Sequence, residues 1–173
     1  HRPLNWSYSM PVAETASTFN EAIVMNHLLE EAASNDEKVA VIEQYLQDVT
    51  QIIVDIYSRY LFETEVFENR KSSFMFAPQL AEIMLNAQKK AYGDGLDEES
   101  LHPYMWINKS HYYSTGLSFY NFPYAFGGLF SRGLYEQYLA KPDGFVEQYS
   151  KLLETTTVAS VEDTAKVMGL DVS

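Results

Sequence analysis

Two carboxylates in the stretch MPVAETASTFNE, residues 10–21, have the spacing of paired groups on one face of a helix. Residues seven positions apart lie two turns from each other on the same side of a helix, so Glu14 and Glu21 project in the same direction. Their neighbours Ala13 and Ser17 are small and allow another helix to come close. Carboxylates in such an interface need a positive partner, which can be a basic side chain or a metal ion. Without that partner, they are ordinary, partly exposed glutamates.

A second group of residues with chemical potential is the stretch HYYSTGLSFYNFPYAFGG, residues 111–128. Tyrosine hydroxyls and an imidazole can donate hydrogen bonds to a carbonyl oxygen or an oxyanion, and glycines permit turns and close backbone approach. Tyrosine is also a common half-buried core residue, and with 13 tyrosines in the chain most must be structural. The stretch is therefore compatible with a binding loop and with plain packing.

Composition narrows the class of protein. The chain has 173 residues, of which 46% are hydrophobic, so it can bury a substantial core as one domain. Its net charge of −12 argues against nucleic-acid phosphates and anionic membranes as partners. The absence of cysteine excludes disulfides and cysteine-ligated metals, and no apolar run has the length of a membrane span. We expect no nucleic-acid partner, no membrane partner and a cytoplasmic location.

Helical periodicity dominates the elements that must position these residues, and no strand-like alternation competes with it. We therefore expect an all-α fold, built as a single α-helical domain over residues 1–173, with the acidic loop at 93–103 as its candidate hinge. Capping and stop signals give the expected helices, which are about 11–33, 36–70, 78–92, a short one within 104–113, one ending near 139, 145–154 and 160–169.

The motifs, in this order along the chain, resemble the oligoendopeptidase F family of zinc metallopeptidases, relatives of thimet oligopeptidase. MPVAETASTFNE resembles the helix that carries the third zinc ligand, and AQKKAYGDGLD is a typical stretch of the family. HYYSTGLSFYNFPYAFGGLF resembles its substrate-binding segment, so the resemblance spans nearly the whole chain. It implies a mostly helical lobe around a deep substrate cleft, hydrolysis of short peptides, and one zinc ion per active site.

The resemblance also implies roles for individual residues. Glu14 matches the zinc ligand, and Glu21 matches a downstream acidic position behind the ligands. His111 matches the histidine that opens the substrate-binding loop. Tyr124 matches the tyrosine that stabilises the tetrahedral intermediate, and Tyr120 matches a tyrosine that binds substrate.

One motif of the family is missing. The four histidines are His1, His27, His102 and His111, and no two have the i, i+4 spacing of HExxH. The resemblance implies that this helix, with two zinc histidines and the general-base glutamate, lies upstream of His1. We therefore expect the C-terminal part of a peptidase catalytic domain, which binds zinc weakly or not at all and is inactive without the remaining N-terminal part. The alternative is a non-catalytic, acidic helical interaction module or a degenerate relative. His27 is expected to be a surface or packing histidine rather than a metal ligand, and His102 is expected in a turn.

Overall fold

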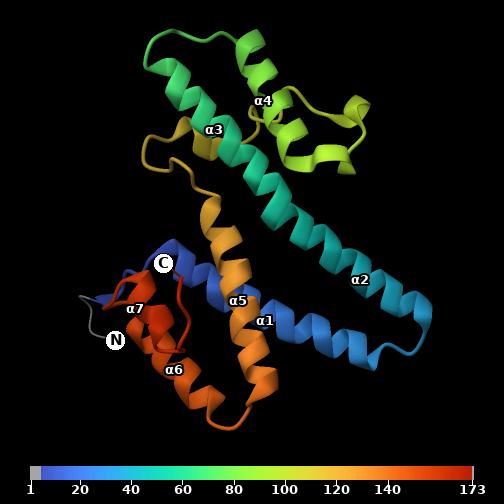
Figure 1. The fold of residues 1–173 in the computed structure, drawn as a ribbon, viewed down its shortest axis with the longest axis vertical. Helices are drawn as coiled ribbons and strands as arrows, with labels where there is room; N and C mark the ends of the chain where they lie inside the picture. Colours follow the sequence, from blue (N-terminus) through green and yellow to red (C-terminus); the bar gives the residue numbers. More distant parts are fainter. Residues whose placement is uncertain (1–4, 173) are drawn as a thin grey trace. The chain divides into compact units, whose positions relative to one another are not determined.

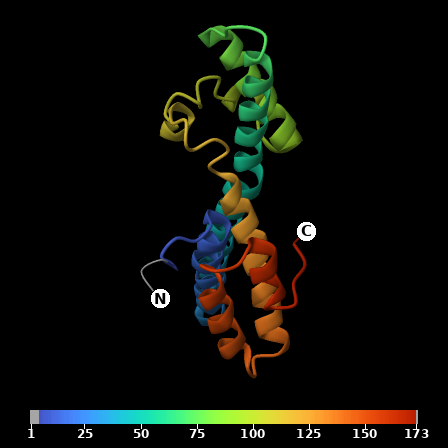
Figure 2. The ribbon, with the colours of Figure 1, turned by 90° about the vertical axis from the view of Figure 1, so that its left-hand side faces the viewer.

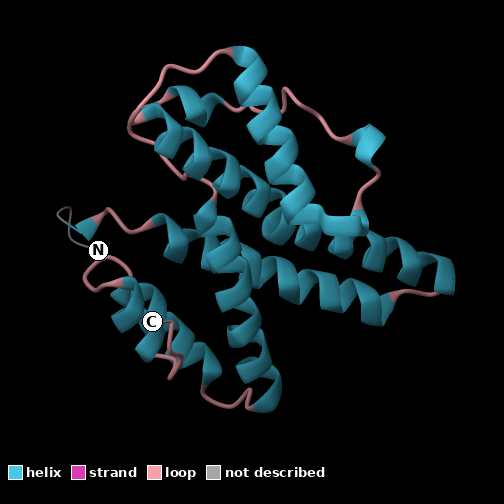
Figure 3. Cartoon of the chain, turned by 45° about the horizontal axis from the view of Figure 1, so that its top comes forward, coloured by secondary structure: helices cyan, strands magenta, loops and turns pink. Residues whose placement is uncertain are grey.

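The structure, a computed structural model, describes residues 5–172, and over that range helices and turns account for all regular structure (Figure 3). The predicted all-α fold is therefore confirmed. The α-helices are α1 (Met10–Glu31), α2 (Asn35–Thr50), α3 (Ile56–Arg70), α4 (Ala77–Tyr92), α5 (Phe122–Ala140), α6 (Phe145–Thr155) and α7 (Val161–Lys166). Within residues 5–172, no helix combines the length and apolar character needed to cross a membrane.

The chain divides into two compact units, which can be followed by the sequence colours of Figure 1. The first unit comprises His1–Glu43 and Pro123–Ser173, and the second comprises Gln44–Phe122. Each unit has its own buried cluster of apolar side chains.

The first unit contains α1, α5, α6 and α7, with α5 and α6 side by side (Figure 2). Pro11 lies in the first turn of α1, where the missing N–H costs no helical hydrogen bond, as predicted. Ser160 caps α7 by accepting a hydrogen bond from the Asp163 N–H at 3.2 Å. The buried core of this unit is formed by Phe19, Phe130, Leu134, Phe145, Leu152, Ala165 and Met168.

The second unit is built on α3 and α4, which pack against each other. Its buried cluster consists of Phe62, Ile83, Met84 and Ala87, with Trp106 and Tyr112 partly buried against it. The helix predicted over 36–70 forms, with a π-helical turn, η2 (Gln51–Asp55), between α2 and α3. The sequence pattern did not indicate that turn.

The short helix predicted within 104–113 forms only in its last part, as the 3₁₀-helix η5 (Ser110–Tyr113), and residues 104–108 form turns. The Gln88 side chain donates to the His102 carbonyl at 3.0 Å and accepts from its N–H at 3.1 Å, and the His102 imidazole accepts from the Tyr104 N–H at 3.2 Å. These bonds tie His102 to α4 and close a turn at Tyr104. The predicted turn role of His102 is confirmed.

Candidate active site

Glu14 lies where α1 meets α5, and Gly127 is the residue that makes this contact possible. A Cβ atom on Gly127 would lie 2.8 Å from the Glu14 carbonyl carbon, 2.9 Å from the Glu14 Cβ and 2.9 Å from the Thr15 nitrogen. Backbone atoms cannot move aside as a flexible side chain can, so this position requires glycine. The Thr18 hydroxyl also donates to the Gly127 carbonyl at 3.0 Å. These contacts fix the backbone of Glu14 against α5.

The two predicted carboxylates have different surroundings. Glu14 is half-buried, whereas Glu21 is exposed. The Oε2 atom of Glu14 accepts a hydrogen bond from the Ser17 hydroxyl at 3.2 Å, and no cation of residues 5–172 pairs with Glu14. A carboxylate that accepts one neutral hydrogen bond keeps further lone pairs for a metal ion. The environment of Glu14 therefore fits an oxygen ligand on a rigid backbone.

The structure offers no complete metal site within residues 5–172, since no three His, Cys, Asp or Glu side chains gather there as a ligand set. His27 is exposed on α1, as predicted. His1 lies outside the described residues.

Tyr124 is half-buried in the first turn of α5. It precedes Gly127 by three residues, so both residues lie on the same face of α5. Because Gly127 contacts α1 at Glu14, this face of α5 is the one that meets α1. The first unit thus places Tyr124 and Glu14 on helices that touch at this crossing.

His111 lies in the second unit and lines a pocket of about 610 Å³ between α3 and the segment that follows η5. Its side chain is buried, with the Tyr112 ring centroid at 4.4 Å and the Tyr120 ring centroid at 5.7 Å. The lining residues are Phe62, Glu63, Val66, Phe67, Arg70, His111, Tyr112, Tyr113, Ser114, Thr115 and Ser118. The ring of Tyr120, a predicted substrate-binding residue, thus packs beside the His111 imidazole.

The surroundings of His111 disfavour the charged form of its imidazole. Burial, then the positive charges of Arg59 and Lys109, lower the pKa of His111 below its usual value of 6.5. Its Nε2 atom lies 2.8 Å from Nδ2 of Asn121. A neutral imidazole carries one donor and one acceptor nitrogen, so His111 can still donate a hydrogen bond to a ligand.

Glu63 is a buried carboxylate in the same pocket that sequence reasoning missed. Its Oε1 accepts a hydrogen bond from the Phe119 N–H at 2.8 Å. Burial raises the pKa of Glu63, and the Phe119 hydrogen bond opposes that rise. The sequence held a signal for it, because Glu63 occupies the place between Tyr60 and Phe67 where the apolar stripe of α3 calls for an apolar residue.

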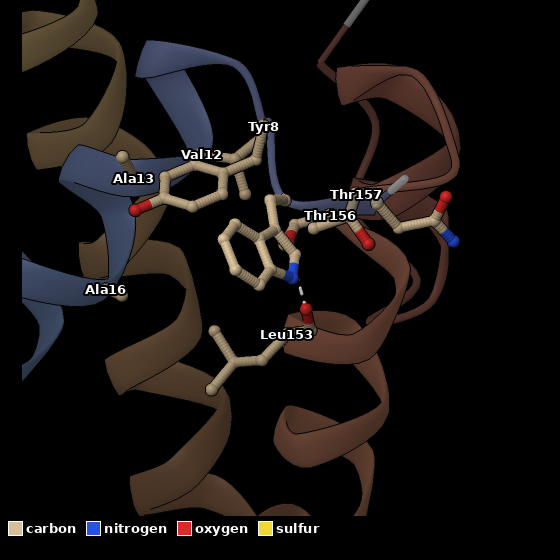
Figure 4. Close-up of a pocket in the computed structure, with 9 residues that line it drawn as sticks. Tyr8, Val12, Ala13, Ala16, Leu153, Thr156 and Thr157 are labelled. Atoms are coloured by element: carbon tan, nitrogen blue, oxygen red, sulfur yellow. Dashed lines mark hydrogen bonds between the residues drawn. The ribbon is translucent and has the colours of Figure 1, made fainter. Parts of the chain in front are cut away.

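The first unit holds a second pocket, of about 580 Å³, between the start of α1 and the end of α6 (Figure 4). Ala13 and Ala16, two of the small residues beside Glu14, line it together with Tyr8, Val12 and Leu153. Among residues 5–172, no carboxylate, imidazole or ammonium group lines this pocket. This pocket is therefore mainly apolar, and the candidate residues Glu14, His111 and Glu63 are not among its lining residues.

Comparison with known proteins finds two curated proteins similar to this chain along its whole length. Oligopeptidase PepF of Bacillus subtilis (strain 168) is 24% identical over 175 residues, which cover 100% of this chain and 26% of that protein. An oligoendopeptidase F homolog of Borreliella burgdorferi (strain ATCC 35210 / DSM 4680 / CIP 102532 / B31) is 27% identical over 173 residues, which cover 98% of this chain and 28% of that protein. No protein-family profile and no solved structure match the chain.

The chain thus spans about a quarter of the length of the curated relatives it matches. Their names agree with the family that the motifs resemble. Both the motifs and the alignment over the whole chain therefore indicate a similarity to oligoendopeptidases. The peptidase activity is named for these two relatives.

Proposed function

We propose that this chain is part of the catalytic domain of a zinc-dependent oligoendopeptidase that hydrolyses short peptides. The observation that carries this proposal is the similarity to two oligopeptidases over essentially the entire chain, which includes the stretch around Glu14. The chain would supply the third zinc ligand and the substrate-binding segment, and the remaining N-terminal part of the same peptidase would be its partner. Alone, it would be inactive.

Glu14 would hold the zinc ion, and Glu21, two turns further along α1, would orient a ligating imidazole through its second nitrogen. The close contact between Gly127 and the Glu14 backbone supports this assignment, because a metal ligand needs a fixed position. Bound zinc would polarise the scissile carbonyl and activate a water molecule.

Tyr124 would donate a hydrogen bond to the substrate oxygen that gains negative charge in the transition state, and His111 would assist the transition state. Tyr120 would contact the substrate backbone beside His111, in agreement with the packing of the two rings. The burial of His111 and the lowered pKa of its imidazole support this role, because a neutral imidazole can donate without bringing a fixed positive charge into the pocket.

Metal analysis of the whole protein that contains this chain tests the proposal. Glu14→Ala should abolish stoichiometric zinc binding and peptide hydrolysis, because the zinc shell loses a ligand. Glu21→Ala should weaken zinc affinity about 10- to 100-fold, as expected for a group behind the ligands. Glu31→Ala, at the exposed end of the same helix, is the matched control and should leave both properties unchanged.

Two outcomes contradict the proposal. The first is undiminished zinc content in Glu14→Ala. The second is a gene that encodes no HExxH before His1, which would favour the alternative of a non-catalytic, acidic helical interaction module.

A further inference from the structure

A chain of polar contacts runs through the second unit and ends at His111. Asp55 and Arg59 form a buried ion pair at the junction of η2 and α3, with side chains 8% and 11% exposed. The Arg59 Nη1 donates to Oδ1 of Asn121 at 3.5 Å, and Nδ2 of Asn121 lies 2.8 Å from Nε2 of His111. The Tyr92 hydroxyl of α4 donates to the other oxygen of Asp55 at 3.4 Å.

The chemistry of these groups fixes the direction of each hydrogen bond. A guanidinium has only donors, so the atom of Asn121 that faces Arg59 must be its carbonyl oxygen. The amide nitrogen of Asn121 then faces His111 and donates. A nitrogen that accepts a hydrogen bond cannot carry a proton, so Nε2 of His111 is bare and the imidazole proton is on Nδ1.

We propose that Asn121 and Arg59 are positioning residues that hold His111, a residue of the pocket lining, as a neutral imidazole whose hydrogen-bond donor is on Nδ1. Within residues 5–172, the structure gives Nδ1 of His111 no hydrogen-bond partner. The ligand that this arrangement suits is a neutral or anionic oxygen acceptor, such as a peptide carbonyl. Only that last assignment, to a peptide, depends on the proposed function.

The charges around His111 act in the same direction. Arg59 and Lys109 both disfavour the imidazolium form, and burial does so most strongly. The carboxylate of Asp55 is paired with Arg59, and that of Glu63 accepts the Phe119 N–H. Tyr92 keeps its proton and its donor role, since burial and Asp55 raise its pKa to about 12. Among the described residues, the titratable and charged groups around His111 and its pocket are Asp55, Arg59, Glu63, Arg70, Tyr92, Lys109, Tyr112, Tyr113 and Tyr120.

Nitrogen-15 NMR of the 173-residue chain tests the proposal, with histidine labelled and the His111 signals assigned by loss in His111→Gln. In the unmutated chain at pH 7, His111 should be neutral and protonated on Nδ1, and its pKa should lie below about 6.5. Asn121→Asp replaces the donor by an acceptor, so Nε2 should gain a proton and the pKa of His111 should rise above that value. Asn86→Asp, which adds the same charge at an exposed position of α4, should change neither.

A proton on Nε2 of the unmutated chain, or an imidazolium at pH 7, would overturn the proposal, and this measurement needs no variant to fold. An unchanged tautomer in a folded Asn121→Asp would also overturn it. A destabilised but correctly folded variant with the native tautomer counts against it too, because a purely structural asparagine would give that result. The outcome is independent of the zinc test on Glu14, so failure of one proposal is distinguishable from failure of the other.

Discussion

Gly127 and Gly133 lie on the same helix, α5, but only Gly127 has no room for a side chain. A Cβ on Gly127 would clash with the backbone of α1, whereas one on Gly133 would meet Leu170 Cδ1 at 3.6 Å, an ordinary contact. The first glycine is needed for helix contact, and the second only lowers helix propensity. Substituting each glycine in turn therefore distinguishes the effect of close helix packing from the effect of helix propensity within α5.

Gly127→Ala should destabilise the chain by about 1–3 kcal/mol, the usual cost of forcing atoms into a packed contact. The matched control Gly133→Ala should stabilise it by up to about 1 kcal/mol, the difference in helix propensity between the two residues. Urea denaturation followed by circular dichroism measures both free energies of unfolding. Equal effects of the two substitutions would show that α5 does not press against Glu14.

At the scale of elements, the segment between η5 and α5 is irregular but held at several points. Phe119 has a φ of 55°, a left-handed backbone conformation that costs a side-chain-bearing residue about 1–2 kcal/mol. Its N–H donates to Glu63, and its ring packs on Tyr60 and Phe67 with centroids at 5.4 and 5.6 Å. Hydrogen bonding and ring packing thus offset the strain and keep the segment beside His111 in place.

This balance predicts an unusual order of stability at position 119. Phe119→Ala loses the ring contacts and retains the strain, whereas Phe119→Gly loses the ring contacts and relieves it. Glycine should therefore be more stable than alanine by about 1 kcal/mol, and both should be less stable than phenylalanine. Ser118→Ala and Ser118→Gly are the control pair, at a neighbouring exposed position without positive φ, and there alanine should be the more stable. Denaturant midpoints measure all four, and alanine ranking above glycine at position 119 would contradict the strain argument.

Elements whose stability comes from local sequence were predictable, and those held by distant contacts were not. Pro11, the stripe of α3 and the Ser160 cap are local signals, and each was interpreted correctly. By contrast, the backbone at His102, where the turns begin, is bonded to Gln88, fourteen residues earlier, and the sequence did not indicate these turns.

The same division applies to the candidate site. The pair Glu14 and Glu21 followed from helical spacing, and the resemblance directed attention to His111. Asn121 and Glu63 were missed because their importance depends on His111 and Phe119, to which the fold brings them from other parts of the second unit. For Glu63, the only local indication in the sequence was a carboxylate within the apolar stripe of α3.

At the scale of the whole molecule, an apolar helical face and a large negative charge oppose each other. No residue of α2 is buried, and Val39, Ile42 and Leu46 are 61%, 44% and 57% exposed. Their three-and-four spacing forms one apolar stripe, the kind of surface that promotes association in water. The net charge of −12 repels a second copy of the chain at low ionic strength.

We therefore expect this chain to self-associate, weakly in dilute salt and more strongly as salt screens the repulsion. Leu46→Lys should reduce the weight-average mass measured by sedimentation velocity at a given concentration, because it interrupts the apolar stripe. Gln44→Lys adds the same charge at an exposed polar position, where the native side chain bonds Asp48 at 3.1 Å, and should have little effect. Since the two variants have equal net charge, a difference between them isolates the apolar contribution. Equal reduction in both would assign the association to charge alone, and a monomer at every concentration and salt level would show that the stripe does not drive association.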